Sequence, residues 1–347
     1  MFTVCCQCWC IVWQATRTSF PRALLPKGSV LFLIAPRRRA QDREEMFFSW
    51  LTYWTTAIME WMVDYALYWL TGKTYLQRIC DDYHQTERTI YIESKLSQVS
   101  NEVVRQTLKG DANANVDHAV VEICRAEGLS HTIEERFADN LRACLVQIHS
   151  VAAVIAHADR LRAERFTSEN SEHEEALLEL WSLLQPDVAL TERMSKQWTD
   201  IGFQGNNPAT DFRGMGYLGL LNLIYFAKHR TAAAQRLLLH SQHPTIGYGF
   251  ALAGINMTSL VLELLSSDHL QAYFYKECCG KTVTLQDLQD VFCGLFEQFD
   301  RFWIAREPEN VMAFNAVRSD YKLALERSLR TRFAWQLSEE EFAAVTS

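Results

Sequence analysis

The 347-residue sequence has little proline and little glycine, 7 and 14 residues respectively, while 48% of its residues are hydrophobic. Disordered and low-complexity chains are rich in proline, glycine and polar residues, so this composition excludes them. A chain of this length can bury a full core, as one large or two small domains. The sequence therefore predicts a folded globular protein.

An excess of positive charge is also missing. The chain has 34 lysine and arginine residues against 42 aspartate and glutamate residues, which gives a net charge of −8 and a pI near 5.7. Proteins that bind the phosphate backbone of nucleic acids concentrate basic residues on one face. We therefore expect no nucleic-acid partner.

The ten cysteines do not follow the spacing of a disulfide framework, so we expect a reducing, intracellular compartment. Four of them crowd the start of the chain: Cys5, Cys6, Cys8 and Cys10. This cluster could bind a metal or carry acyl chains, but no second cluster of histidine or cysteine accompanies it at zinc-site spacing. The sequence therefore predicts no metal and no cofactor.

Residues 1–45 differ in composition from the rest of the chain, with seven basic and three acidic side chains. An arginine-rich, acid-poor start is typical of an organelle transit segment, but Pro21, Pro26 and Pro36 interrupt any long amphipathic helix. The other interpretation is a non-native extension upstream of a start codon at Met46. Both remain open, and 1–45 is treated as an extension outside the fold.

The next stretch, 46–70, is rich in tryptophan and tyrosine. Its polar residues recur every three or four positions, as on one stripe of a helix: Ser49, Thr52, Thr56, Glu60 and Asp64. Two carboxylates near the middle of a span would cost roughly 2.5–3.5 kcal/mol each, so a transmembrane helix is disfavoured. Two interpretations remain for this aromatic amphipathic helix: it lies in a membrane interface, or it covers the core of the domain.

The remaining chain shows helical periodicity and no long alternation of apolar and polar residues, which predicts an all-α, compact multi-helix fold. We divide it into a helical region at 71–170, a main domain at 171–330 and a polar tail at 331–347. One helix is expected from Ile90 through Val104, and Thr132 with Glu135 forms a capping box before a long helix. Ser171 with Glu174 is expected to cap the next one.

A glycine-rich stretch from Trp198 to Gly216 precedes an apolar helix and is the candidate functional loop. Thr210 and Asp211 have side chains suited to an N-cap, which would place Arg213 in the first turn of that helix. A cation is mismatched with the positive end of a helix dipole and favours an anionic partner. The alternative is an internal Arg213–Asp211 ion pair.

This stretch resembles the signature of the ELMO domain, in its ELMOD branch. The residues that carry the resemblance are Trp198, Gly202, Phe203, Gln204, Pro208, Thr210, Asp211, Phe212, Arg213, Gly214, Gly216, Leu220, Leu223 and Phe226. Many fixed residues at fixed spacing make the match specific. Weaker similarity extends over most of 46–330, and 1–45 falls outside it.

The resemblance implies an all-helical GTPase-activating protein for Arf-family, especially Arf-like, small GTPases, in which Arg213 matches the proposed catalytic arginine. Such a protein is not an enzyme by itself, because GTP and Mg²⁺ belong to the partner. The resemblance also implies a cytoplasmic protein peripheral to endoplasmic reticulum, lipid droplet or mitochondrial membranes. The other ten residues of the loop would shape it or bind the partner, and Gln204 would either brace the loop or orient a water.

Two other functions compete with this interpretation. Larger ELMO proteins act as adaptors rather than activators, and a non-catalytic adaptor that binds small GTPases or their regulators is the main alternative. A metalloenzyme or hydrolase built on His240, His243, Cys278 and Cys279 is disfavoured, because Pro244 breaks the helical geometry that an i, i+3 pair of histidine ligands needs.

Because 1–45 lacks helical periodicity and lies outside the resemblance, we expect its removal to leave folding and activity unchanged. Thermal unfolding of 46–347 beside the full chain tests this, and a clear fall in melting temperature on truncation would contradict it.

Overall fold

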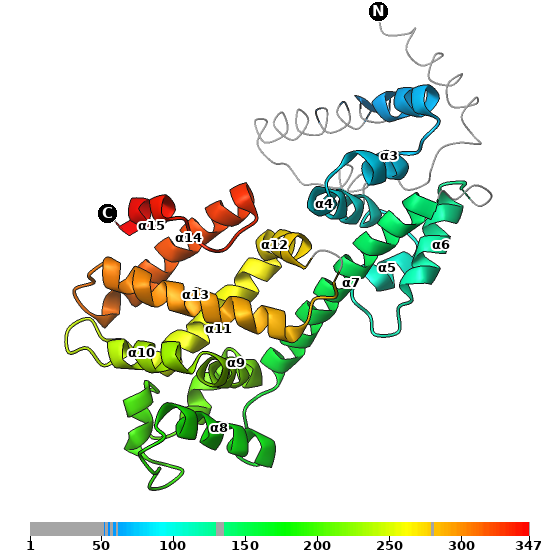
Figure 1. The fold of residues 1–347 in the computed structure, drawn as a ribbon. Coiled ribbons are helices and arrows are strands. Elements are labelled where there is room, and N and C mark those ends of the chain that lie inside the picture. The colour runs from blue at the N-terminus through cyan, green and yellow to red at the C-terminus, as the bar shows by residue number, and fades with distance from the viewer. Residues whose placement is uncertain are drawn as a thin grey trace, which may run out of the picture.

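The computed structural model describes residues 52, 55, 58, 59, 62–129, 135–278 and 281–346. All regular structure within these ranges is helical, which confirms the predicted all-α fold. Figure 1 shows α3 to α6 gathered at one end, the later helices at the other, and α7 running between them.

The elements follow one another along the chain as α3 (Tyr75–Asp82), α4 (Gln85–Leu96), α5 (Glu102–Leu108), α6 (Val116–Ala126), α7 (Glu135–Ala163), α8 (Ser171–Leu184), η3 (Lys196–Ile201), η4 (Pro208–Arg213), α9 (Gly216–His229), α10 (Thr231–Ser241), α11 (Phe250–Ser266), α12 (His269–Glu277), α13 (Leu285–Ala305), η5 (Val311–Ala313), α14 (Phe314–Arg332) and α15 (Glu339–Thr346). The elements η3, η4 and η5 are short 3₁₀ helices.

The long helix α7 connects the two ends of the molecule. Its 29 residues correspond to a length of about 43 Å. Phe137, Leu141, Leu145 and Ile148 lie on one face of this helix and are all buried. At mid-helix the buried Gln147 bonds Thr89 of α4 at 2.9 Å and the Tyr275 carbonyl of α12 at 3.2 Å. By length and hydropathy α7 could cross a membrane, but half of its apolar window is buried inside the fold, as expected of a core helix.

Two predicted boundaries are wrong. The single helix expected from Ile90 to Val104 is two helices, because the Asn101 side chain caps α5 by accepting the Val103 and Val104 N–H groups. The N-cap of α8 is Asn170 rather than Ser171. Glu174, which was expected to complete that cap, instead forms an ion pair with Arg193.

Helix α9 lies at the centre of the later helices and is buried on nearly all sides, as its apolar sequence predicts. Gly254 of α11 faces it, and a Cβ at Gly254 would overlap the Leu223 side chain. The two helices therefore pack closely at this point. At the start of α13, Thr284 and Asp287 form a capping box.

The part of 46–70 that the structure describes is helical at 52, 55, 58, 59 and 62–70. The described apolar side chains are exposed rather than packed on the core, up to 76% for Trp69 and 82% for Leu70. Asp64 pairs with Arg78 of α3. Trp50, Trp54 and Trp61 lie outside the described residues, so the amphipathic character of the whole stretch stays a prediction.

Candidate functional site

The candidate loop forms a short 3₁₀ helix, η4, before the apolar helix α9. The Asn207 side chain caps η4 by accepting the Ala209 N–H at 3.2 Å, and Pro208 occupies the first helical position. Arg213 is the last residue of η4, and α9 begins at Gly216 with Met215 as its N-cap. The expected N-cap at Thr210 and Asp211 is therefore wrong, and Arg213 precedes α9.

Asp211 fastens the loop to itself and does not pair with Arg213. One carboxylate oxygen accepts the Gln204 N–H at 2.9 Å, and the other accepts the Thr210 hydroxyl at 3.2 Å. Arg213 is exposed, and its Nε donates to the Thr210 carbonyl at 3.0 Å. Among the described residues, no carboxylate lies within ion-pair distance of its guanidinium. The predicted alternative of an internal Arg213–Asp211 pair is wrong.

Buried aromatic rings form a platform beneath the loop. Trp198 is fully buried and donates its Nε1 to the Arg193 carbonyl at 2.9 Å. Phe203 meets the ring of Trp198 edge-on at 5.8 Å and that of Phe212 at 5.6 Å. Trp198 thus packs in the core. With Pro208 also buried, both ends of the loop are held while Gln204 and Arg213 face solvent.

The four glycines of the loop have two different roles. Gly202 and Gly216 have φ of +87° and +51°, and a Cβ at either would overlap backbone: that of Gly249 and Phe250 for Gly202, and the carbonyl oxygens of Arg162 and Glu164 for Gly216. At Gly205 and Gly214 an added Cβ would meet no other atom within 4 Å. Of the four, only these two have open space around them, and Gly214 directly follows Arg213.

The end of α7 is joined to this loop. The Tyr217 N–H donates to the Glu164 carbonyl at 2.9 Å, and the Glu164 carboxylate lies 2.9 Å from the buried His173 ring. The ring of Tyr217 lies against that of His173 at 4.3 Å. Burial and the neighbouring glutamates, Glu172 first among them, raise the pKa of Tyr217. Its hydroxyl therefore stays protonated and is no general base at neutral pH.

The two histidines of the alternative metalloenzyme or hydrolase site serve local structure. His240 bonds the buried Asp300 at 2.8 Å, and the His243 ring accepts the Thr245 N–H at 3.3 Å. Burial raises the pKa of Cys278, so its thiol is not activated. Cys279 lies outside the described residues. Within the described ranges no three His, Cys, Asp or Glu residues are placed to hold a metal ion.

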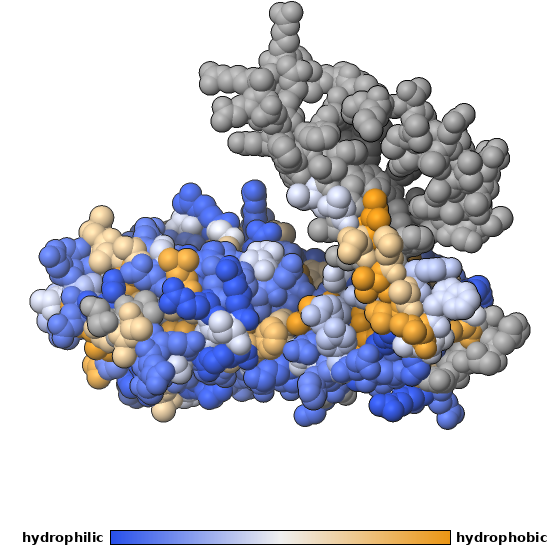
Figure 2. Space-filling view, turned by 90° about the horizontal axis from the view of Figure 1, so that it is seen from above, coloured by the Kyte–Doolittle hydropathy of each residue, from blue (hydrophilic) through white to orange (hydrophobic). Residues whose placement is uncertain are grey.

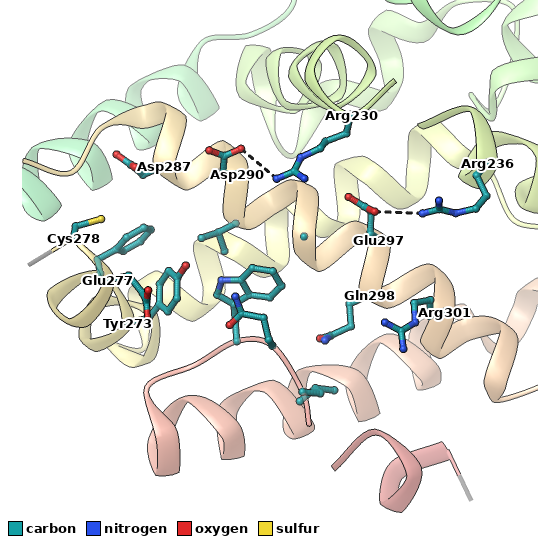
Figure 3. Close-up of a pocket in the computed structure, with 16 residues that line it drawn as sticks. Arg230, Arg236, Tyr273, Glu277, Cys278, Asp287, Asp290, Glu297, Gln298 and Arg301 are labelled. Atoms are coloured by element: carbon teal, nitrogen blue, oxygen red, sulfur yellow. Dashed lines mark hydrogen bonds and ion pairs between the residues drawn. The ribbon is translucent and has the colours of Figure 1, made fainter. Parts of the chain in front are cut away.

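A hollow of about 670 Å³ lies away from the loop, along α13 between α10, α12 and the segment before α15 (Figure 3). Charged side chains that line it form ion pairs with one another: Arg236 and Glu297 are 3.3 Å apart, and Arg230 and Asp290 are 3.9 Å apart. The ring of Trp335 covers Gly294 at its floor. This hollow is a groove between helices in which neighbouring charges neutralise one another.

Two residues of the site were missed from the sequence. Asn207 starts η4, and the pair Asn207-Pro208 is a recognisable signal for a helix start. Arg193 bonds the Asn207 side chain at 3.4 Å and the Glu174 carboxylate, joining the loop to α8. No sequence signal identifies Arg193, because its partners are 14 and 19 residues away.

Comparison with known proteins gives a consistent result. Residues 156–318 match the model of the ELMO/CED-12 family. The chain is 37% identical to mouse (Mus musculus) ELMO domain-containing protein 2 over 80% of its own length and 94% of that protein. It is 38% identical to bovine (Bos taurus) ELMO domain-containing protein 1, over 75% of the chain and 85% of the relative. ELMO domain-containing protein B of Dictyostelium discoideum is 32% identical over 76% of the chain and 93% of that protein.

The two glycines nearest Arg213 offer a matched test of the loop. We expect Gly216→Ala to destabilise the protein by at least about 2 kcal/mol, because its left-handed φ and its Cβ overlap with two carbonyl oxygens are both unfavourable. Gly214→Ala should stay within about 0.5 kcal/mol of the wild type. Chemical denaturation measures both, and equal stabilities would contradict the tight contact with the end of α7.

Proposed function

The chain belongs to the family of ELMO domain-containing proteins, and on this premise we propose that it is a GTPase-activating protein for Arf-family, especially Arf-like, small GTPases. In this proposal Arg213 enters the active site of the partner GTPase and contacts the γ-phosphate of GTP. The supporting observation is an exposed arginine, without a carboxylate partner among the described residues, on a loop fixed at both ends.

The chemistry requires one such side chain. Transfer of a phosphoryl group to water places negative charge on the oxygens around the γ-phosphate, and a guanidinium supplied by a partner stabilises that charge. An arginine provided in trans raises the hydrolysis rate by roughly 10³–10⁵. This corresponds to about 4–7 kcal/mol of activation free energy. The nucleotide and Mg²⁺ belong to the GTPase, so the activator needs neither a metal nor a cofactor.

The bonds of Arg213 suit this role. Its Nε is held by the Thr210 carbonyl, while Nη1 and Nη2 have no hydrogen-bond partner among the described residues. A planar guanidinium can therefore offer two parallel N–H groups to two phosphate oxygens. Asp211 is a positioning residue in this arrangement, since its bonds to Gln204 and Thr210 shape the turn that presents the arginine.

We expect Arg213→Ala to bind its GTPase but to reduce stimulated hydrolysis at least about a hundredfold, because the arginine acts on charge that develops in the transition state. Arg213→Lys should also lose most activity, since lysine lacks the planar fork. Single-turnover hydrolysis with a panel of GTP-loaded Arf and Arf-like proteins measures both. Thermal melts serve as the control and should match the wild type.

The result also separates an activator from an adaptor. Undiminished hydrolysis with Arg213→Ala would end the proposal of a catalytic arginine. A wild-type protein that binds a GTPase of the panel without stimulating it would favour the non-catalytic adaptor.

We also propose that the helix at 62–70 and the described positions before it contact a membrane surface. The exposed apolar side chains of this segment are Ile58, Met59, Met62, Val63, Tyr65, Leu67, Tyr68, Trp69 and Leu70. Figure 2 views the molecule from the side on which Figure 1 places this helix and shows a hydrophobic patch there. A helix that exposes aliphatic and aromatic side chains, as this one does with Tyr65, Tyr68 and Trp69, suits a bilayer interface. Cytoplasmic faces of endoplasmic reticulum, lipid droplets or mitochondria are the membranes proposed.

The combined change Met59→Ser, Trp69→Ser and Leu70→Ser should release the protein from lipid vesicles, because it removes the most exposed apolar groups of the segment. Vesicle sedimentation measures the bound fraction. Leu239→Ser is the control, because Leu239 of α10 is 70% exposed and belongs to the other end of the molecule. Equal sedimentation of the triple variant and the wild type would contradict the proposal.

A further inference from the structure

We propose that an apolar patch beside the arginine loop, formed by Leu178, Val188 and Met194, is the surface on which the GTPase docks. This inference rests on the proposed function and names a second contact of the same complex. The three side chains are 45%, 46% and 48% exposed. Leu178 belongs to α8, and the other two belong to the connection between α8 and η3.

Two contacts hold the connection between α8 and η3 against α8. Trp181 of α8 donates its Nε1 to the Val188 carbonyl at 2.8 Å. Arg193, the neighbour of Met194, binds both oxygens of the Glu174 carboxylate, with Nη2 to Oε1 at 2.8 Å. Leu178 lies one helical turn from Glu174 and one from Trp181. The connection, which carries Val188 and Met194, therefore runs alongside the turn of α8 that carries Leu178.

The patch is continuous with the arginine loop through Arg193. Its Nη1 bonds the Asn207 side chain at 3.4 Å, and its carbonyl accepts the Trp198 Nε1–H at 2.9 Å. Asn207 in turn caps η4, which ends at Arg213. Arg193 and Asn207 therefore connect the patch to Arg213. In Figure 1 α8 lies at the end of the molecule opposite α3.

A single arginine contributes too little contact area to hold a specific complex by itself. Stable protein interfaces bury about 800 Å² per partner and have an apolar centre within a polar rim. The residues around the patch provide such a rim, and its charge is acidic. Within 171–195 the exposed acidic residues without an ion pair among the described residues are Glu172, Glu175, Asp187 and Glu192.

The charge of this rim defines the partner surface. Arg193 is neutralised by Glu174, and the nearby Lys228 lies 3.0 Å from Glu179. Lys196, two residues after Met194, is exposed as well. With four unpaired acidic side chains against this one lysine, the rim is negative overall, and Arg213 beyond it supplies the cation for the nucleotide. A GTPase that fits this face presents apolar side chains surrounded by lysine and arginine. Opposite charges at the rim would accelerate association and make it sensitive to salt.

The test uses the full chain with the GTPase that the wild type stimulates most strongly. The combined change Leu178→Ser, Val188→Ser and Met194→Ser should raise KM and the directly measured Kd about tenfold or more while leaving kcat unchanged. Arg213→Ala is expected to do the opposite, because it should keep binding and lose stimulated hydrolysis. Leu323→Ser is the matched control, because Leu323 is 61% exposed and belongs to α14, away from α8 in Figure 1.

A second variant avoids any change to packing. Glu175→Lys with Glu192→Lys reverses two exposed rim charges, and it should lower the association rate and flatten its salt dependence. Unchanged Kd in the serine variant, or loss of kcat with unchanged KM, would overturn the docking surface. If the wild type binds a GTPase without stimulating it, the catalytic proposal fails and the Kd comparison still decides the patch. If it binds none, both fail.

Discussion

The close contact between the end of α7 and the start of α9 is the constraint on which the candidate site depends. Gly216 lies against the carbonyl oxygens of Arg162 and Glu164, where a side chain has no room. The contact fixes the start of α9 at Gly216. It thereby also fixes the position of Arg213, the last residue of η4. Because α7 also packs on α4, α5 and α6, the same helix joins the core of the first region to the functional loop.

Sequence patterns predicted the features that depend on local interactions. The long helix expected after Thr132 is present as α7, and the apolar helix expected after the candidate loop is present as α9, because both depend on residues a few positions apart. The identity of the loop followed from many fixed residues at fixed spacing.

The errors arose where distant contacts or competing caps decide the structure. Thr210 and Asp211 look like an N-cap, but Asn207 and Pro208 start a 3₁₀ turn first and direct Asp211 back toward Gln204. The start of α9 depends on carbonyl groups more than 50 residues upstream, which no local pattern reports. The division of the helix at Ile90 to Val104 similarly reflects the capping strength of Asn101.

The bracing of the loop has a consequence for conformational entropy. Disordered segments that fold on binding lose backbone freedom at that moment, at a cost of about 1–2 kcal/mol per residue. In this loop the backbone between Gly202 and Gly216 is already fixed by Asp211, by Asn207 and by the aromatic rings beneath it. Only the Arg213 side chain remains to be ordered, which costs no more than about 2 kcal/mol. Folding of the domain therefore bears the loss of backbone entropy in this loop that docking would otherwise incur.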